Sequence, residues 1–167
     1  QKNKETEEKW RSKLKKYKGP KIGINSLTSL SGKNIPMKYF MQLASNFDFN
    51  FIFLQKSINK SELKEIANRK NLIYFSDIDS SNKAFVDSIE IIKNLDLIIT
   101  ADTSIAHVSA TLEKNTWIPL PFVSDWRWFL EEKSSRWYDN VTLYRSKKIN
   151  NWDIPFQTIE KDLKKFF

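Results

Sequence analysis

The chain has 167 residues, of which 40% are hydrophobic and 14% aromatic, so it is long enough to form one globular domain with a buried core. It contains no cysteine and a single histidine, which excludes disulfide bonds, cysteine-based zinc sites and metal sites built from several histidines. No apolar run approaches the roughly 18 residues that a membrane-spanning helix needs, and no signal-peptide pattern opens the sequence.

The net charge of +8 is concentrated at the two ends of the chain. Residues 1–18 hold 8 basic and 3 acidic side chains, residues 145–167 hold 6 basic and 3 acidic ones, and residues 19–144 hold 14 of each. Because a nucleic-acid-binding surface needs a continuous basic patch, this distribution predicts solvated ends and no nucleic-acid partner. The open alternative is that the basic ends contact an anionic surface, either a nucleic acid or, at most peripherally, a membrane.

Residues 1–18 predict a charged helix with a narrow apolar stripe formed by Trp10, Leu14 and Tyr17. The following Gly19 and Pro20 are typical of a helix end. We interpret this segment as a charged linker or interdomain helix, followed by a domain at 19–167. Because the chain starts with Gln rather than Met, we expect that it is a fragment or a processed product and that any partner domain lies upstream.

Residues 21–94 alternate short apolar strands with amphipathic helices. The pattern predicts strands at 21–25, 49–54 and 72–75, and helices at 36–46, 61–70 and 83–94. Asn59 or Ser61 is expected to cap the second of these helices. Polar loops at 26–34 and 77–82 separate the elements.

Residues 96–120, DLIITADTSIAHVSATLEKNTWIPL, predict a strand at 97–100, a tight turn, a helix and a strand at 117–120. A crossover of this size implies that the two strands are parallel. The Trp-rich residues 121–140 show no clear period, and a strand at 141–145 and a helix at 152–167 complete the chain. About six strands alternating with helices predict an α/β fold with a Rossmann-like, doubly wound, mostly parallel sheet.

Two loops are expected to meet at one ligand, since both follow the carboxyl ends of strands. The loop 26–34 offers hydroxyl groups, among them Ser26 and Thr28, and one cation, Lys33. Such a loop can hold a phosphate, although it is not a Walker A motif because the Gly spacing and the Lys-Ser/Thr pair are missing. An ordinary surface loop is the alternative interpretation.

The second loop contains Asp102, Thr103 and Ser104, which are all residue types that cap helices. The N-terminus of the helix that follows would attract an anion such as a phosphate. His107 lies four residues after Thr103, on the same helix face, where its imidazole could donate to phosphate and gain charge near neutral pH. Alternatively, Asp102 is only a helix cap and His107 a partly buried packing residue.

A third group follows the strand at 117–120. Phe122, Asp125 and Trp126 could border a pocket for a base, a ribose or a sugar by stacking and hydrogen bonding. The alternative is that the clustered aromatic residues fill the core or an interface.

Residues 96–145 resemble the C-terminal part of bacterial tetratricopeptide-repeat proteins that end in a heptosyltransferase-like domain of glycosyltransferase family nine. The resemblance rests on Asp-Thr-x-x-Ala-His at 102–107, Trp-x-x-Leu-Pro-Phe at 117–122, Asp-Trp-Arg-Trp at 125–128 and Trp-Tyr at 137–138. The resemblance covers about residues 20–165 and is weaker before residue 96, where Lys33 stands at a position at which relatives usually carry Arg.

The resemblance implies one half of a GT-B fold, in which two Rossmann-like halves face a cleft. This chain would be the C-terminal, donor-binding half of an inverting, metal-independent transferase of hexose or heptose. The catalytic base would lie in the N-terminal half, and helical repeats could precede it. The ligand would be a nucleotide-diphosphate sugar as substrate, without a cofactor, in the cytoplasm and possibly at the inner membrane face.

The same resemblance implies individual roles. Thr103 and Ser104 would bind the diphosphate, Lys33 and His107 would neutralise charge on the leaving nucleotide, and Asp102 would cap and orient the turn. Ser26 and Thr28 would add hydroxyl groups, and Phe122, Asp125 and Trp126 would form the pocket wall. Two other functions stay open: a nucleotide-sugar-binding or scaffold module without turnover, and a basic-ended peripheral protein.

Overall fold

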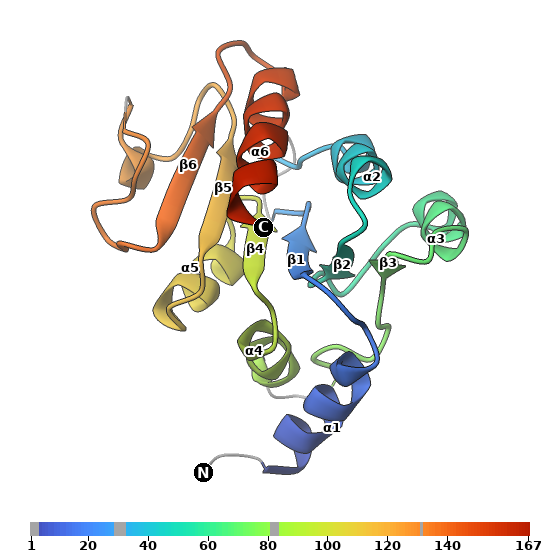
Figure 1. Cartoon of the computed structure of the whole chain (residues 1–167). Coiled ribbons are helices and arrows are strands. Elements are labelled where there is room, and N and C mark those ends of the chain that lie inside the picture. The colour runs from blue at the N-terminus through green and yellow to red at the C-terminus, as the bar shows by residue number, and fades with distance from the viewer. Residues whose placement is uncertain (1–3, 29–32, 81–83, 131) are drawn as a thin grey trace.

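The computed structural model describes residues 4–28, 33–80, 84–130 and 132–167. Six strands form one sheet in the order β3-β2-β1-β4-β5-β6, and every neighbouring pair is parallel. Their bounds are β1 Lys21–Asn25, β2 Asn50–Phe53, β3 Leu72–Ile73, β4 Leu97–Thr100, β5 Thr116–Leu120 and β6 Val141–Arg145. The prediction of a Rossmann-like, doubly wound sheet is confirmed (Figure 1).

Six α-helices connect and flank the strands (Figure 1). Their bounds are α1 Lys4–Lys15, α2 Met37–Asn46, α3 Lys60–Ala67, α4 Val86–Lys93, α5 Ser104–Thr111 and α6 Asp153–Phe166, and a short 3-10 helix, η1, spans Trp126–Trp128. In the described part of the chain, no helix combines the length and the apolar composition needed to cross a membrane.

The two faces of the sheet are covered by different helices. Helices α2, α3 and α6 contribute to a core cluster that includes Phe40, Ile66 and Phe156. Helices α1, α4 and α5 pack on the other face, in a cluster that includes Trp10 and Ile105. A third cluster joins α5 to β5, β6 and the 3-10 helix. Because helices cover both faces of the sheet, nearly all strand residues are buried, which explains why each strand is a nearly continuous apolar run.

Gly23 in the middle of β1 shows how closely the second face is packed. A Cβ atom at this position would lie 2.7 Å from Leu95, 2.8 Å from Ile98 and 2.9 Å from Leu54. Any larger residue would therefore force three apolar side chains away from the sheet.

Several local predictions hold and others need correction. Asn59 caps α3 in a capping box with Glu62, as expected from the sequence. Among the described residues, helix α4 begins at Val86, and the predicted start at residue 83 lies outside them. Its buried residues include Asp87 and Ser88, which the apolar pattern did not predict. Both polar residues are buried because their side chains have partners in the β3–α4 connection.

The N-terminal segment is folded onto the domain. Trp10 and Leu14 are fully or almost fully buried, and α1 lies beside α4 (Figure 1). The proposed division into a helix at 1–18 and a domain at 19–167 stays a prediction.

Candidate functional site

The strand order reverses direction between β1 and β4, and open α/β sheets place their ligands outside the carboxyl ends of the strands at such a switch point. Asn25, the last residue of β1, is only 4% exposed. Its Nδ2 atom donates to Thr103 Oγ1 at 3.2 Å, to Thr100 Oγ1 at 3.3 Å and to the Leu27 carbonyl at 3.1 Å. One amide therefore ties the loop after β1 to the turn after β4, and the predicted meeting of these two loops is observed.

A hollow of about 340 Å³ opens at this point of the sheet. Of the predicted site residues, Thr28, Thr103 and Ser104 line it. The other lining residues come from the ends of β1 and β2, from the connection between β3 and α4, and from α4 and α5: Asn25, Leu27, Leu54, Gln55, Lys56, Ser57, Asp79, Phe85, Ser88 and Ile105. The lining combines apolar and polar side chains, as ligand pockets usually do.

The first turn of α5 faces this hollow. The N-cap residue is Thr103, whose Oγ1 atom accepts a hydrogen bond from the Ile105 amide at 3.2 Å. The prediction that Asp102 caps the turn is wrong, because Thr103 occupies that position in an extended conformation and Asp102 pairs elsewhere. The amide of the exposed residue Ser104 has no acceptor among the described residues, so it can bind an anion.

Lys56 supplies a cation to the hollow. Its Nζ atom donates to the Asp79 carbonyl at 2.8 Å, and it forms no ion pair with a described carboxylate. The sequence analysis did not include Lys56 in the site. Lys56 follows the apolar run of β2 by two residues, and β2 lies next to β1, so this position could have indicated a role. Asn25 was missed in the same way, since it was assigned to the strand alone.

The other two residues predicted in the loop after β1 do not line the hollow. Ser26 is buried, and both its amide and its hydroxyl donate to Gln55 Oε1 at 2.9 Å. Lys33 is half-buried and forms no ion pair with another described residue. Its role toward a phosphate stays a prediction.

A second polar group surrounds Asp102 and Arg127. The Arg127 guanidinium lies 3.8 Å from Asp102 Oδ1 and 3.4 Å from Asp125 Oδ1. The Asp102 side chain is only 6% exposed, and its Oδ1 atom has no hydrogen bond within the described residues. Arg127 therefore compensates a buried carboxylate, and two carboxylates in turn compensate its own charge.

His107 belongs to this second group and not to the hollow. Its Nδ1 atom lies 3.1 Å from the Tyr138 hydroxyl, and its ring stacks on Trp128 with centroids 5.6 Å apart. Burial, followed by the charge of Arg127, holds the pKa of His107 below its ordinary value of 6.5, against the opposing effect of Asp102 and Asp125. The prediction that this imidazole gains charge near neutral pH is wrong, because burial favours the neutral ring.

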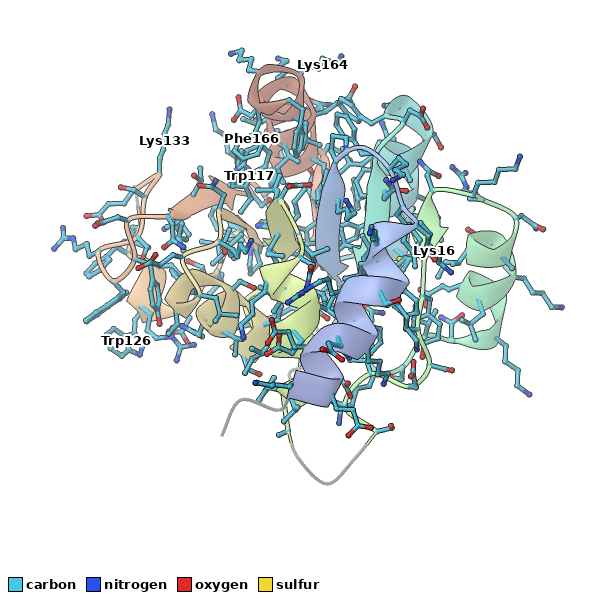
Figure 2. The ribbon with its side chains drawn as sticks, turned by 60° about the horizontal axis from the view of Figure 1, so that its bottom comes forward. Lys16, Trp117, Trp126, Lys133, Lys164 and Phe166 are labelled. Atoms are coloured by element: carbon cyan, nitrogen blue, oxygen red, sulfur yellow. The ribbon has the colours of Figure 1, made fainter. Side chains whose placement is uncertain are left out.

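The predicted pocket wall lies apart from the hollow. Phe122 is 53% exposed and Trp126 is 74% exposed, and Figure 2 shows Trp126 at the edge of the molecule. Asp125 caps the 3-10 helix by accepting from the Arg127 amide at 3.1 Å. None of the three lines the hollow, and their contact with a donor stays a prediction.

The geometry suits an anionic ligand. In the described part of the chain, no three His, Asp or Glu side chains are placed to hold a metal ion. The positive charge at the hollow comes from the start of α5 and from Lys56.

Solved structures show which fold this is. The chain aligns with a family 9 glycosyl transferase from Veillonella parvula with a TM-score of 0.69 and 11% identity, over 97% of this chain and 51% of that one. It aligns with the Escherichia coli heptosyltransferase WaaC, solved with ADP, with a TM-score of 0.67 and 11% identity, over 96% of this chain and 48% of that one.

The chain has the fold of one half of a family 9 glycosyltransferase. WaaC solved with ADP-2-deoxy-2-fluoro heptose also matches, with a TM-score of 0.59 and 12% identity, over 89% of this chain and 46% of that one. The chain thus spans about half the length of each of these glycosyltransferase structures. No family model and no curated protein matches the sequence.

The resemblance inferred from the Asp-Thr-x-x-Ala-His and Trp-rich motifs is confirmed at the level of the fold. An association with helical repeats stays a prediction.

Proposed function

We propose that this chain is the nucleotide-sugar-binding half of an inverting glycosyltransferase of the heptosyltransferase-like type. The observation that carries the proposal is the hollow at the carboxyl ends of β1 and β4, into which the first turn of α5 opens. The fold supports it, because the similar structures are glycosyltransferases of which one is solved with ADP and with an ADP-sugar analogue.

The diphosphate of the donor would lie at the start of α5. The free amide of Ser104 and the positive end of the helix favour the phosphate charge. Thr28, whose hydroxyl donates to Asn34 Oδ1 at 3.2 Å, lines the same space. Asn25 fixes the hydroxyl of Thr103, so the turn is held in place before the ligand arrives. A preformed site of this kind avoids an ordering cost on binding.

The transfer reaction creates negative charge on the departing nucleoside diphosphate. A cation and a helix N-terminus can stabilise that charge without a metal ion. We assign the cationic role to Lys56, with Lys33 as a further candidate, and not to the neutral His107. The nucleoside would occupy the part of the hollow between Leu54, Phe85 and Ile105, which offers apolar contact for a base.

The structure of the hollow favours binding without turnover by this chain alone. Asp79 is the one acidic residue among the described lining residues, and both of its carboxylate oxygens accept hydrogen bonds from α4. It is therefore not free to act as a general base. We infer that the base, the acceptor site and full activity belong to a second Rossmann-like half, in a parent enzyme that acts in the cytoplasm.

Isothermal titration calorimetry of the chain with ADP, UDP and GDP, and with a hexose conjugate of each, tests the proposal. We expect one site per chain and one preferred base. Absence of binding to every nucleotide would overturn the assignment. A labelled-sugar transfer assay on the parent protein then separates an enzyme from a binding module.

A further inference from the structure

Helix α1 is attached to the rest of the molecule through a buried hydrogen bond. Trp10 is fully buried, and its Nε1 atom donates to Asp87 Oδ1 on α4. The indole ring also meets the Phe75 ring edge-on, with centroids 5.2 Å apart and an interplanar angle of 70°. Three lysine contacts surround this point: Lys9 lies 3.0 Å and Lys13 lies 2.9 Å from Asp77, and Lys9 lies 3.5 Å from Asp87.

Asp87 continues the network toward the hollow. Its second oxygen, Oδ2, accepts from the Asp79 amide at 2.9 Å, and Asp79 Oδ1 accepts from the Asp87 amide at 2.8 Å. Ser88 donates to Asp79 through both its amide and its hydroxyl. Asp79 and Asp87 are 3% and 8% exposed, so these bonds are shielded from water and the loss of one is costly.

Asp79 is at the same time part of the wall of the hollow. It lines the hollow together with Phe85 and Ser88, and its carbonyl accepts from Lys56. Asp79 has a φ of 47° and Phe85 a φ of 62°, both in the left-handed region that side chains other than glycine seldom adopt. Such conformations persist only where the surrounding structure stabilises them. Here the two reciprocal hydrogen bonds between Asp79 and Asp87 stabilise them.

We propose that Trp10 is a positioning residue for the nucleotide pocket. Through Asp87 and Asp79, it fixes the wall of the hollow opposite the start of α5, and it also fixes the position of the Lys56 ammonium group. The inference rests on the proposed function, since it concerns the same hollow. Trp10 does not touch the ligand. It acts by fixing Asp87 Oδ1, which also lies 3.5 Å from Lys9, so that Oδ2 stays in place to accept from the Asp79 amide.

The test compares two matched substitutions of a buried tryptophan. Trp10→Phe keeps a ring in the core and removes the Nε1 donor. Trp152→Phe makes the same change on the opposite face of the sheet, where Trp152 is 5% exposed and belongs to the other core cluster. Binding of ADP, UDP and GDP is measured by calorimetry for both variants, and thermal unfolding is recorded in parallel.

We expect Trp10→Phe to weaken binding of the preferred nucleotide about tenfold, which corresponds to one buried hydrogen bond to a charged group. Trp152→Phe should leave the nucleotide affinity within about twofold of the unaltered chain, even if it lowers the unfolding temperature as much as Trp10→Phe does. Amide hydrogen exchange should also become faster at Asp79, Asp87 and Ser88 in Trp10→Phe and stay unchanged there in Trp152→Phe.

Equal affinity of Trp10→Phe and the unaltered chain would overturn the positioning role while leaving the proposed function intact. Equal protection of Asp79 and Asp87 in the two variants would overturn it as well. If the unaltered chain binds none of the three nucleotides, the proposed function itself fails, and the positioning role fails with it.

Discussion

Two polar regions meet at the start of α5, and they differ in how their charges are compensated. Toward β1, Thr103, Ser104 and Lys56 line an open hollow. Among the described residues, the Ser104 amide has no acceptor, and the Lys56 ammonium group donates to the Asp79 carbonyl but forms no ion pair. Toward β5 and the 3-10 helix, Asp102 and Asp125 surround Arg127. The first region can gain from an anion, whereas the second already holds opposite charges together.

The difference shows why residue type alone does not define a site. Arg127 is the stronger anion-binding residue type, since its guanidinium can form two parallel hydrogen bonds to phosphate. Here the Arg127 guanidinium already pairs with the carboxylates of Asp102 and Asp125, and an added anion would have to compete with them. Lys56 has no such competitor, so its charge is available to a ligand.

The largest effect on nucleotide affinity should come from a negative charge placed in the first region, the open one that contains Thr103, Ser104 and Lys56. Ser104→Glu puts a carboxylate where the phosphate would lie, and like charges in contact cost several kcal/mol, so nucleotide affinity should fall by about a hundredfold or more. The fold should not suffer, because an acidic residue at a helix N-terminus is favourable. Calorimetry and thermal unfolding measure the two effects separately.

Thr158→Glu on α6 is the matched control for Ser104→Glu, because it makes the same change in charge at an exposed position of another helix. It should bind nucleotide as the unaltered chain does. Undiminished binding by Ser104→Glu would remove the start of α5 from the site.

A smaller effect is expected from the cation of the open region. Lys56→Met removes the charge but keeps most of the side-chain length, and the loss of a charge-assisted hydrogen bond should weaken nucleotide binding about tenfold. The free energy of unfolding should change little because Lys56 is exposed. Lys161→Met, an exposed lysine on α6, serves as control, and equal affinities for the two variants would contradict the role of Lys56.

In the region around Arg127, where Asp102 and Asp125 already compensate the positive charge, a substitution should lower the stability of the fold and leave nucleotide affinity unchanged. Arg127→Met leaves the buried Asp102 carboxylate without its positive neighbour, and we expect the free energy of unfolding to fall by about 1 kcal/mol, since Arg127 is partly exposed. Nucleotide affinity should stay within about twofold. Urea unfolding of Arg127→Met and of the exposed-pair control Arg136→Met measures the difference; a large loss of affinity in Arg127→Met would place Arg127 in the site.

The smallest effect concerns pH. The pKa of His107 is lowered on folding by burial and by Arg127, so its contribution to stability is present above the unfolded value of 6.5 and is lost as the pH falls through the folded value. Because the chain has a single histidine, His107→Phe should flatten this part of the stability profile. Urea unfolding between pH 7 and about pH 5 checks this, and an unchanged slope would contradict the neutral, buried state.

The sequence predicts the sheet well because each strand is a short apolar run with a clear boundary. The alternation with helices predicts parallel strands joined by right-handed crossovers. It does not determine the strand order, in which β1 pairs with the distant β4. The two loops after β1 and β4 could likewise be placed at one edge of the sheet. These features depend on local patterns of ten to thirty residues.

Three of the failures involve partners far apart in the sequence, whereas the wrong helix cap, Asp102 in place of its neighbour Thr103, is a local one. His107 was expected to gain charge near neutral pH, but burial and the charge of Arg127, which follows 20 residues later, lower its pKa. Asp87 was not expected to be buried, because its partner Trp10 precedes it by 77 residues. Lys56 was not predicted in the site, because its partner there, the Asp79 carbonyl, follows it by 23 residues. No periodicity in the sequence reports such contacts.

The most direct test of the account is a nucleotide titration followed by backbone amide NMR on the unaltered chain. With the preferred nucleoside diphosphate, we predict that the amides of Ser104, Ile105 and Lys56 shift first and most. Those of Asp125, Arg127 and Tyr138 should shift little, because they belong to the group in which Asp102 and Asp125 already compensate the charge of Arg127. Shifts confined to residues 122–138, or no shifts at saturating nucleotide, would contradict the assignment of the site to the hollow at the start of α5.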